Sequence, residues 1–166
     1  MAEHLETDVL IIGSGIAGAT AALVLADAGV GVTVVTRAAE PEDTNTYWAQ
    51  GGIIYKGEDD SPALLAEDIL RAGDGHSNPR AVRIVAENGP DALRRILLER
   101  VDVPFDRSAD GDLSLALEGG HTLPRIIHAA DATGKAIELA LLNAVRGHAN
   151  ITLLTQHTAV DLLTPS

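Results

Sequence analysis

The sequence predicts an α/β fold built on a parallel β-sheet. Three observations near the N-terminus support this prediction: an apolar run at Asp8–Ile12, a glycine-rich turn at Gly13–Gly18, and a β-branched run at Val32–Thr36. The Ala- and Leu-rich segment Ala19–Ala28 favours a helix, and Gly29 is suited to end it. Together they form a βαβ unit with parallel strands and a right-handed crossover. The continuous apolar character of the first strand predicts burial on both of its faces.

Four further segments have helical apolar spacing. These segments are Pro62–Ala72, Pro79 to about Asn88, Asp91–Arg100 and Thr133–Ala149. Asn78 is a suitable N-cap for the second segment, and the pair Gly89-Pro90 predicts a break before the third. In the last segment the residues expected on one apolar face are Ile137, Leu141, Ala144 and Val145.

Three more strands and two irregular stretches complete the expected organisation. Leu113–Leu117 alternates Leu with small residues, and Ile151–Leu154 and Ala159–Leu163 are apolar runs typical of strands. Ala38–Gly52 and Glu118–Thr133 lack periodicity, and we expect the first of them to be a functional loop.

Composition narrows the class of protein. A chain of 166 residues with 46% hydrophobic and 22% charged residues is globular, and its length fits one domain. The absence of cysteine excludes a disulfide scaffold and thiolate metal sites. The net charge of −12 argues against nucleic acid or an anionic membrane as a partner. With no long apolar run and no basic leader at the N-terminus, we expect a cytoplasmic protein without membrane contact.

The glycine-rich turn has the spacing G-x-G-x-x-G between a strand and a helix. Gly13 permits a tight turn, Gly15 lets the backbone approach a pyrophosphate, and Gly18 lets the helix pack close to the strand. The pyrophosphate would lie at the helix N-terminus, where the dipole favours an anion. The motif therefore predicts a dinucleotide site, against the simpler interpretation of a turn that only needs small residues.

The end of the second strand leaves the dinucleotide undecided. An acidic residue that binds the ribose is usual here, but this chain has Thr36 and Arg37. Arg37 could face the 2′-phosphate of NADP, contact the adenosine part of FAD, or lie in solvent. From these residues alone, NADP and FAD remain equally open.

The stretch Asn45–Ile53 combines polar side chains, two aromatic residues and a glycine pair. Thr46 and Gln50 can form hydrogen bonds, and Tyr47 and Trp48 could pack beside an extended ring. The pair Gly51-Gly52 would allow a flat ligand to approach the backbone. Taken alone, the stretch could equally be an ordinary loop anchored by its aromatic residues.

Four blocks of sequence carry a resemblance to a known family. They are Asp8–Gly18, Asn45–Ile53, Glu118–His121 and His128–Gly134. In this order and spacing they resemble the N-terminal part of proteins of the L-aspartate oxidase family. That family is a member of the fumarate reductase and succinate dehydrogenase flavoprotein superfamily. The resemblance implies a Rossmann-like FAD-binding domain, incomplete in this chain, with FAD rather than NADP as cofactor. Residues 1–166 would be the N-terminal part of that domain, and its remaining elements, a capping domain and the catalytic Arg would lie outside.

The resemblance also assigns the cofactor residues. Those expected to bind FAD are Gly13, Ser14, Gly15, Ile16, Ala17, Gly18, Arg37, Asn45, Thr46, Tyr47, Trp48, Ala49, Gln50, Gly51, Gly52, Thr158 and Ala159. Asn45 stands where the succinate dehydrogenase branch often has a His that bonds covalently to the flavin, so we expect non-covalent FAD.

Glu118 and His121 are the substrate residues that the resemblance implies. Glu118 would orient the substrate through its amino group, because a carboxylate attracts an ammonium and repels a plain dicarboxylate. His121 would be a second substrate contact. We expect Arg125 to pair with a substrate carboxylate, Glu118 or Asp131. We expect His128 and Asp131 to be structural residues that link the loop to the next helix. The spacing of these groups does not match a helical zinc motif, so we expect no metal.

The implied activity is FAD-dependent oxidation of L-aspartate to iminoaspartate, an oxidoreductase step in quinolinate and NAD biosynthesis. Oxygen or fumarate would accept the electrons, and quinolinate synthase would be a downstream partner. We expect residues 1–166 alone to be inactive. The alternatives are a succinate or fumarate oxidoreductase flavoprotein, a non-catalytic nucleotide-binding module, and an NADP-binding domain that uses Arg37.

Overall fold

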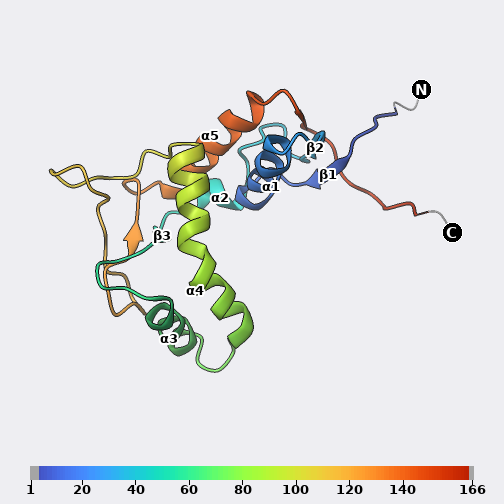
Figure 1. The fold of residues 1–166 in the computed structure, drawn as a ribbon. Helices are drawn as coiled ribbons and strands as arrows, with labels where there is room; N and C mark the ends of the chain where they lie inside the picture. The colour runs from blue at the N-terminus through green and yellow to red at the C-terminus, as the bar shows by residue number, and fades with distance from the viewer. Residues whose placement is uncertain (1–3, 165–166) are drawn as a thin grey trace. The chain divides into compact units, whose positions relative to one another are not determined.

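The computed structural model describes residues 4–164. The described chain divides into two compact units (Figure 1). The first unit comprises the residues up to Ala49 and those from Ile137 onward, and the second comprises Gln50–Ala136.

A parallel three-stranded sheet forms the centre of the first unit and confirms the predicted α/β fold. Its strands are β1 (Val9–Ile12), β2 (Val32–Val35) and β5 (Ile151–Leu154), with β2 in the middle. Val32 lies opposite Val9 on one side and opposite Ile151 on the other. All four residues of β2 are buried, as its continuous β-branched sequence requires.

Helix α1 (Ile16–Asp27) connects β1 to β2 and completes the predicted βαβ unit (Figure 1). Its buried residues are Ala19, Ala22, Leu23 and Ala26. Three of these four side chains are methyl groups, which lets the helix axis come close to the sheet. The φ angle of +87° at Gly29 is left-handed and ends the helix where the sequence predicted.

The first strand is buried on one face only, so the prediction of burial on both faces is wrong for the described chain. Ile11 packs against the core cluster around Ala22 and Val34, whereas Leu10 and Ile12 are 52% and 68% exposed. Successive strand residues point to opposite faces of a sheet. Because the described residues cover only one face of β1, its alternate side chains remain at the surface.

The first unit also contains α2 and the part of α5 from Ile137 onward. Helix α2 (Asn45–Trp48) is a single turn inside the loop expected at Ala38–Gly52, and the Thr44 side chain caps it by accepting the Tyr47 N–H. Helix α5 (Thr133–Arg146) buries three of the predicted face residues, Ile137, Leu141 and Val145. It ends at Arg146, before Gly147, rather than at Ala149.

The second unit contains a two-stranded antiparallel ladder and a helical pair. Strands β3 (Ile53–Ile54) and β4 (Ile126–Ile127) pair so that Ile53 lies opposite Ile127. Helix α3 (Pro62–Ala72) has its predicted bounds, and the Ser61 side chain caps it by accepting the Leu64 N–H. Helix α3 packs against α4. Strands of two residues are too short to show a period, so the sequence did not predict this ladder.

The predicted break at Gly89-Pro90 is wrong. Helix α4 (Pro79–Leu93) continues through Pro90, and the π-helix η1 (Arg94–Arg100) follows it directly. A proline inside a helix removes one backbone hydrogen bond and costs about 3 kcal/mol. Burial of Ala86 and Leu93 on either side of Pro90 opposes that cost, because both side chains leave water only if the helix continues.

Two of the predicted strands are absent from the described chain. Leu113–Leu117 forms only isolated bridges, one from Leu113 to Arg107 and one from Ala116 to Ile126. Ala159–Leu163 has no regular structure, and Val160 and Leu163 are 92% and 89% exposed. An apolar run becomes a strand only where a neighbouring edge supplies backbone partners. No helix among residues 4–164 is long and apolar enough to cross a membrane.

Candidate functional site

The glycine-rich turn joins β1 to α1 with a geometry that only glycine allows at two positions. Gly13 has a φ of +105°, and its N–H donates to the Val35 carbonyl at 2.8 Å. A Cβ on Gly18 would lie 2.0 Å from the carbonyl oxygen of Gly13. The third glycine therefore permits the close contact between helix and strand that the sequence motif predicts.

The start of α1 is bonded to two segments that follow much later in the chain. Gly15 is its N-cap and contributes no side-chain hydrogen bond. The Ile16 N–H donates to Thr46 Oγ1 at 3.0 Å, and the buried Ser14 hydroxyl donates to the Pro41 carbonyl at 2.6 Å. These bonds hold the glycine-rich turn against the loop before α2.

A cavity of about 530 Å³ lies at the carboxyl ends of β1 and β2 in the first unit. Ligands of open α/β sheets bind at this end of the strands. The residues that line the cavity are Ile12, Gly13, Ser14, Gly15, Ile16, Ala17, Gly18, Val35, Thr36, Arg37, Asp43, Thr44, Asn45, Thr46, His157, Thr158 and Ala159.

This lining contains most of the residues that the sequence assigned to a cofactor. It brings the glycine-rich turn together with Arg37, the pair Asn45-Thr46 and the pair Thr158-Ala159. It adds Asp43, Thr44 and His157, which the sequence analysis did not single out although they directly precede assigned blocks. The cavity fits a dinucleotide pyrophosphate, because α1 has no acidic residue in its first turn and its dipole favours an anion there.

The remaining assigned residues lie outside the lining of this cavity. Tyr47 and Trp48 make an edge-to-face contact with ring centroids 5.2 Å apart, and Trp48 Nε1 donates to Asp43. Ala49 directly follows them as the C-cap of α2, whereas Gln50, Gly51 and Gly52 belong to the second unit. A Cβ on Gly52 would lie 2.1 Å from Cγ2 of Ile126, so strand packing already requires this glycine.

A carboxyl group that the sequence analysis overlooked is buried in the first unit. Glu138 of α5 is 0% exposed, and within the described residues neither of its oxygens has a hydrogen-bond partner. Burial, opposed by the nearby hydroxyls of Thr44 and Thr46, raises its pKa to about 7. Its position one helical turn before the buried Leu142 could have indicated its burial.

The second unit contains a buried ion network centred on Arg125, which is 0% exposed. Its Nε and Nη2 donate to the two carboxylate oxygens of Asp60 at 2.8 and 2.9 Å, and its Nη1 donates to Asp68 at 2.6 Å. This result corrects the expected pairing of Arg125 with a substrate carboxylate, Glu118 or Asp131. A guanidinium satisfied by two buried carboxylates has few donors left for a substrate.

Asp68 ties this network to the turn that carries the expected substrate residues. It accepts hydrogen bonds from the backbone N–H and the hydroxyl of Thr122 at 2.9 and 3.0 Å. Burial alone would raise the pKa of Asp68, but the bonds from Thr122, Arg125 and Arg71 hold it far below its usual range. The carboxylate is therefore charged in the folded protein and fixes the turn to α3.

Glu118 and His121 lie at the two ends of that turn. The His121 N–H donates to the Glu118 carbonyl at 3.2 Å, and the Glu118 side chain is exposed. His121 Nδ1 lies 3.1 Å from Nη1 of Arg125. Because a guanidinium only donates, Nδ1 must accept, and the ring proton of neutral His121 resides on Nε2.

His128 is bonded to Asp106 of the preceding irregular segment. Its Nδ1 lies 2.8 Å from the Asp106 carboxylate, which also accepts the Ala130 N–H. The bond from Ala130 and the one with His128 lower the pKa of Asp106. Among residues 4–164, no group of three or more His, Asp or Glu side chains is arranged to hold a metal ion.

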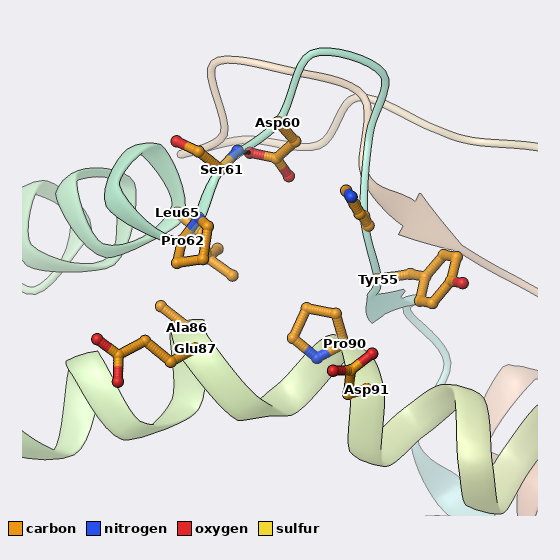
Figure 2. Close-up of a pocket in the computed structure, with 10 residues that line it drawn as sticks. Tyr55, Asp60, Ser61, Pro62, Leu65, Ala86, Glu87, Pro90 and Asp91 are labelled. Atoms are coloured by element: carbon orange, nitrogen blue, oxygen red, sulfur yellow. Dashed lines mark hydrogen bonds between the residues drawn. The ribbon is translucent and has the colours of Figure 1, made fainter.

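A second cavity of about 190 Å³ lies in the second unit between α3 and α4. Figure 2 shows Pro62 and Leu65 of α3 facing Ala86 and Pro90 of α4. Asp60 contributes to its wall while its carboxylate is bonded to Arg125. This cavity is much smaller than the one beside the glycine-rich turn.

Comparison with known proteins identifies the family. Residues 8–166 match the family model described as FAD binding domain. The L-aspartate oxidase of Halobacterium salinarum is 41% identical over 164 residues, a match that covers 99% of this chain and 31% of that protein. The L-aspartate oxidase of Streptomyces coelicolor is 44% identical over 162 residues, covering 96% of this chain and 27% of that protein. The chain thus spans less than a third of the length of these relatives.

Solved structures agree with this family. Mycobacterium smegmatis Sdh1 in complex with UQ1 superposes with a TM-score of 0.82 at 30% identity, covering 93% of this chain and 28% of that one. A quinol-fumarate reductase with menaquinol molecules gives a TM-score of 0.88 over 99% of this chain and 29% of its own. At 24% identity, the second likeness shows the fold alone.

The family match settles the choice of cofactor that the residues alone left open. The family match extends over nearly the whole chain, and it decides between FAD and NADP in favour of FAD. The resemblance to L-aspartate oxidase predicted from four short blocks is also confirmed. The chain belongs to the FAD binding domain family of flavoproteins.

Proposed function

We propose that this chain is the N-terminal, FAD-binding portion of an L-aspartate oxidase, which oxidises L-aspartate to iminoaspartate. The structural observation that supports this most strongly is the cavity at the carboxyl ends of β1 and β2, lined by the glycine-rich turn. The sequence observation is the identity of 41% and 44% to two L-aspartate oxidases over nearly the whole chain.

The residues that line the cavity would hold the two ends of the cofactor. Gly13–Gly18 would receive the pyrophosphate at the start of α1, and Arg37 with Thr158-Ala159 would receive the adenosine end. Asn45 and Thr46, which also line the cavity, would lie toward the flavin. The amide of Asn45 offers no nucleophile, so the FAD is held without a covalent bond.

Glu118 and His121 would bind the substrate. The exposed Glu118 carboxylate offers acceptors to the ammonium of L-aspartate and repels a dicarboxylate that lacks this ammonium. His121, with Nδ1 occupied by Arg125, presents Nε2–H as a donor to a substrate carboxylate oxygen. Because Glu118 accepts and His121 donates hydrogen bonds on the same turn, the two side chains would bind L-aspartate in one orientation.

FAD, when bound, supplies the acceptor for the hydride that leaves Cα of the substrate. The contribution of this chain is to position the two reactants and to exclude unsuitable substrates. The ion network of Arg125, Asp60 and Asp68 stabilises the turn that carries Glu118 and His121, so that the two side chains keep a fixed spacing.

The wider role of the whole protein is part of the same proposal. Electrons would pass to oxygen or to fumarate, and iminoaspartate would be consumed in quinolinate and NAD biosynthesis, with quinolinate synthase as the downstream enzyme. We propose a cytoplasmic location, which is consistent with a net charge of −12.

The test is a substrate panel on the full-length protein. With L-aspartate we expect hydrogen peroxide in air and fumarate-dependent turnover without air. With succinate we expect neither hydrogen peroxide nor fumarate-dependent turnover, because the Glu118 carboxylate repels succinate. Rapid oxidation of succinate without oxidation of L-aspartate would replace the proposal by a succinate or fumarate oxidoreductase.

A further inference from the structure

Glu138 is the least satisfied polar side chain among the described residues. It is 0% exposed on α5, and both of its carboxylate oxygens lack a hydrogen-bond partner at acceptable distance and angle. A buried carboxyl group without partners costs several kcal/mol, and natural proteins seldom retain one without a function. The proposed function assigns no role to Glu138.

The groups nearest to this carboxyl belong to the loop that lines the FAD cavity. The hydroxyls of Thr44 and Thr46 lie near enough to favour its ionised form, whereas burial and the charge of Glu42 favour its protonated form. The charge of Glu42 is in turn balanced by Arg146, whose Nη2 lies 3.2 Å away. Glu138 therefore faces two hydroxyls and no cation of its own within the described residues.

Both hydroxyls already accept a backbone N–H. Thr46 Oγ1 accepts from Ile16 at 3.0 Å, and Thr44 Oγ1 accepts from Tyr47 at 3.2 Å. Each hydroxyl also has one hydrogen to donate. That hydrogen cannot point along the bonds to Ile16 and Tyr47, so it needs an acceptor on the other side of the oxygen. Glu138 is a buried acceptor without a partner in the same unit, and both hydroxyls lie near enough to lower its pKa.

We propose that Glu138 is a positioning residue for the FAD site, taking the hydroxyl hydrogens of Thr44 and Thr46 so that their oxygens stay aimed at Tyr47 and Ile16. The inference rests on the FAD-binding part of the proposed function. It assigns to α5 the task of orienting the loop, since Ile16 opens the helix at which the pyrophosphate would bind.

Side chains of different hydrogen-bonding capacity would affect the loop differently. Glutamine keeps the size and one acceptor oxygen, but its NH₂ must face one of the two hydroxyls. Leucine offers no acceptor, so both hydroxyls would turn and weaken their bonds to Ile16 and Tyr47. Loss of a hydrogen bond to a charged group corresponds to about a tenfold change in an equilibrium constant.

The test measures FAD affinity by flavin fluorescence in the full-length apoprotein. We expect Glu138→Leu to weaken binding about tenfold or more, and Glu138→Gln to weaken it by a smaller factor. Thr46→Val should weaken binding about as much as Glu138→Leu. The matched control is Leu142→Ala, which opens the same buried face of α5 one turn away and should change FAD affinity less than twofold.

A double-mutant cycle separates positioning from general damage to the core. If Glu138 acts through Thr44 and Thr46, the loss of FAD affinity in the Glu138→Gln/Thr46→Val protein is smaller than the sum of the two single losses. Full additivity of the two losses, or wild-type affinity in both Glu138 variants, would overturn the inference. Glu138→Gln conserves volume, so the cycle remains decisive if Glu138→Leu does not fold. Failure of the wild-type protein to bind FAD would instead overturn the proposed function.

Discussion

The backbone N–H of Ile16 donates to the side-chain oxygen of Thr46 at 3.0 Å, which joins two motifs that are 30 residues apart in the sequence. Ile16 opens α1 at the end of the glycine-rich turn, and Thr46 lies in α2. Together with the bond from the Ser14 hydroxyl to the Pro41 carbonyl, it places the polar loop beside the dinucleotide turn. It explains why both motifs line one cavity.

Replacement of Gly18 by alanine should abolish FAD binding and destabilise the protein by several kcal/mol. The new Cβ would lie 2.0 Å from the backbone oxygen of Gly13, so either the turn or the helix must move. Urea denaturation and an FAD titration measure the two effects.

The matched control for this change is Gly89→Ala in α4. The nearest atom to a Cβ there is Cγ1 of Val85 at 3.9 Å, and alanine favours a helix by up to about 1 kcal/mol over glycine. This variant should bind FAD like the wild type and should not lose stability. Equal FAD affinity in both variants would contradict the role assigned to Gly18.

Replacement of Arg125 by methionine should destabilise the protein by roughly 3–5 kcal/mol. The change leaves the carboxylates of Asp60 and Asp68, 4% and 2% exposed, buried without their cation. The control is Arg94→Met, because Arg94 is 43% exposed and pairs with the exposed Glu99. Chemical denaturation of both variants measures the difference. Similar stability of the two would contradict the importance of the buried network.

The pH dependence of stability should differ between the wild type and Glu138→Gln. The pKa of Glu138 rises from 4.5 to about 7 on folding, so the folded state binds more protons between these values. The wild type should therefore lose stability relative to the glutamine variant as the pH rises from 4.5 through 7. Chemical denaturation of both apoproteins across this pH range measures the difference in their free energies of unfolding. A constant difference would show that Glu138 does not titrate in that window.

The FAD should leave the protein on acid precipitation. Asn45, which borders the cavity, has no nucleophilic side chain with which to bond the flavin. We expect the yellow colour in the supernatant and an intact protein mass without added flavin. Flavin that stays with the pellet would show a covalent bond and contradict the role assigned to Asn45.

The sequence predicted the βαβ unit correctly because its signals are local. A β-branched run, a glycine-rich turn and an Ala-rich helix each have a short-range pattern, and together they require the βαβ unit that the structure contains. The pairing of β5 with β2 instead depends on contacts between distant residues, which periodicity does not reveal.

The errors arose where tertiary contacts outweigh local preference. Pro90 does not end α4, since buried side chains flank it on both sides. Arg125 lies in a block that resembles a substrate site, but the carboxylates that bind it, Asp60 and Asp68, are more than 50 residues earlier in the chain. The sequence around Glu138 does not distinguish it from an exposed polar residue on an amphipathic helix, because its burial depends on residues distant in the chain.

Anaerobic addition of L-aspartate to the full-length protein, followed by its flavin absorbance, tests the central claim most directly. The proposed function predicts that the absorbance of the oxidised flavin disappears with L-aspartate and persists with succinate. Bleaching by succinate and not by L-aspartate would contradict it.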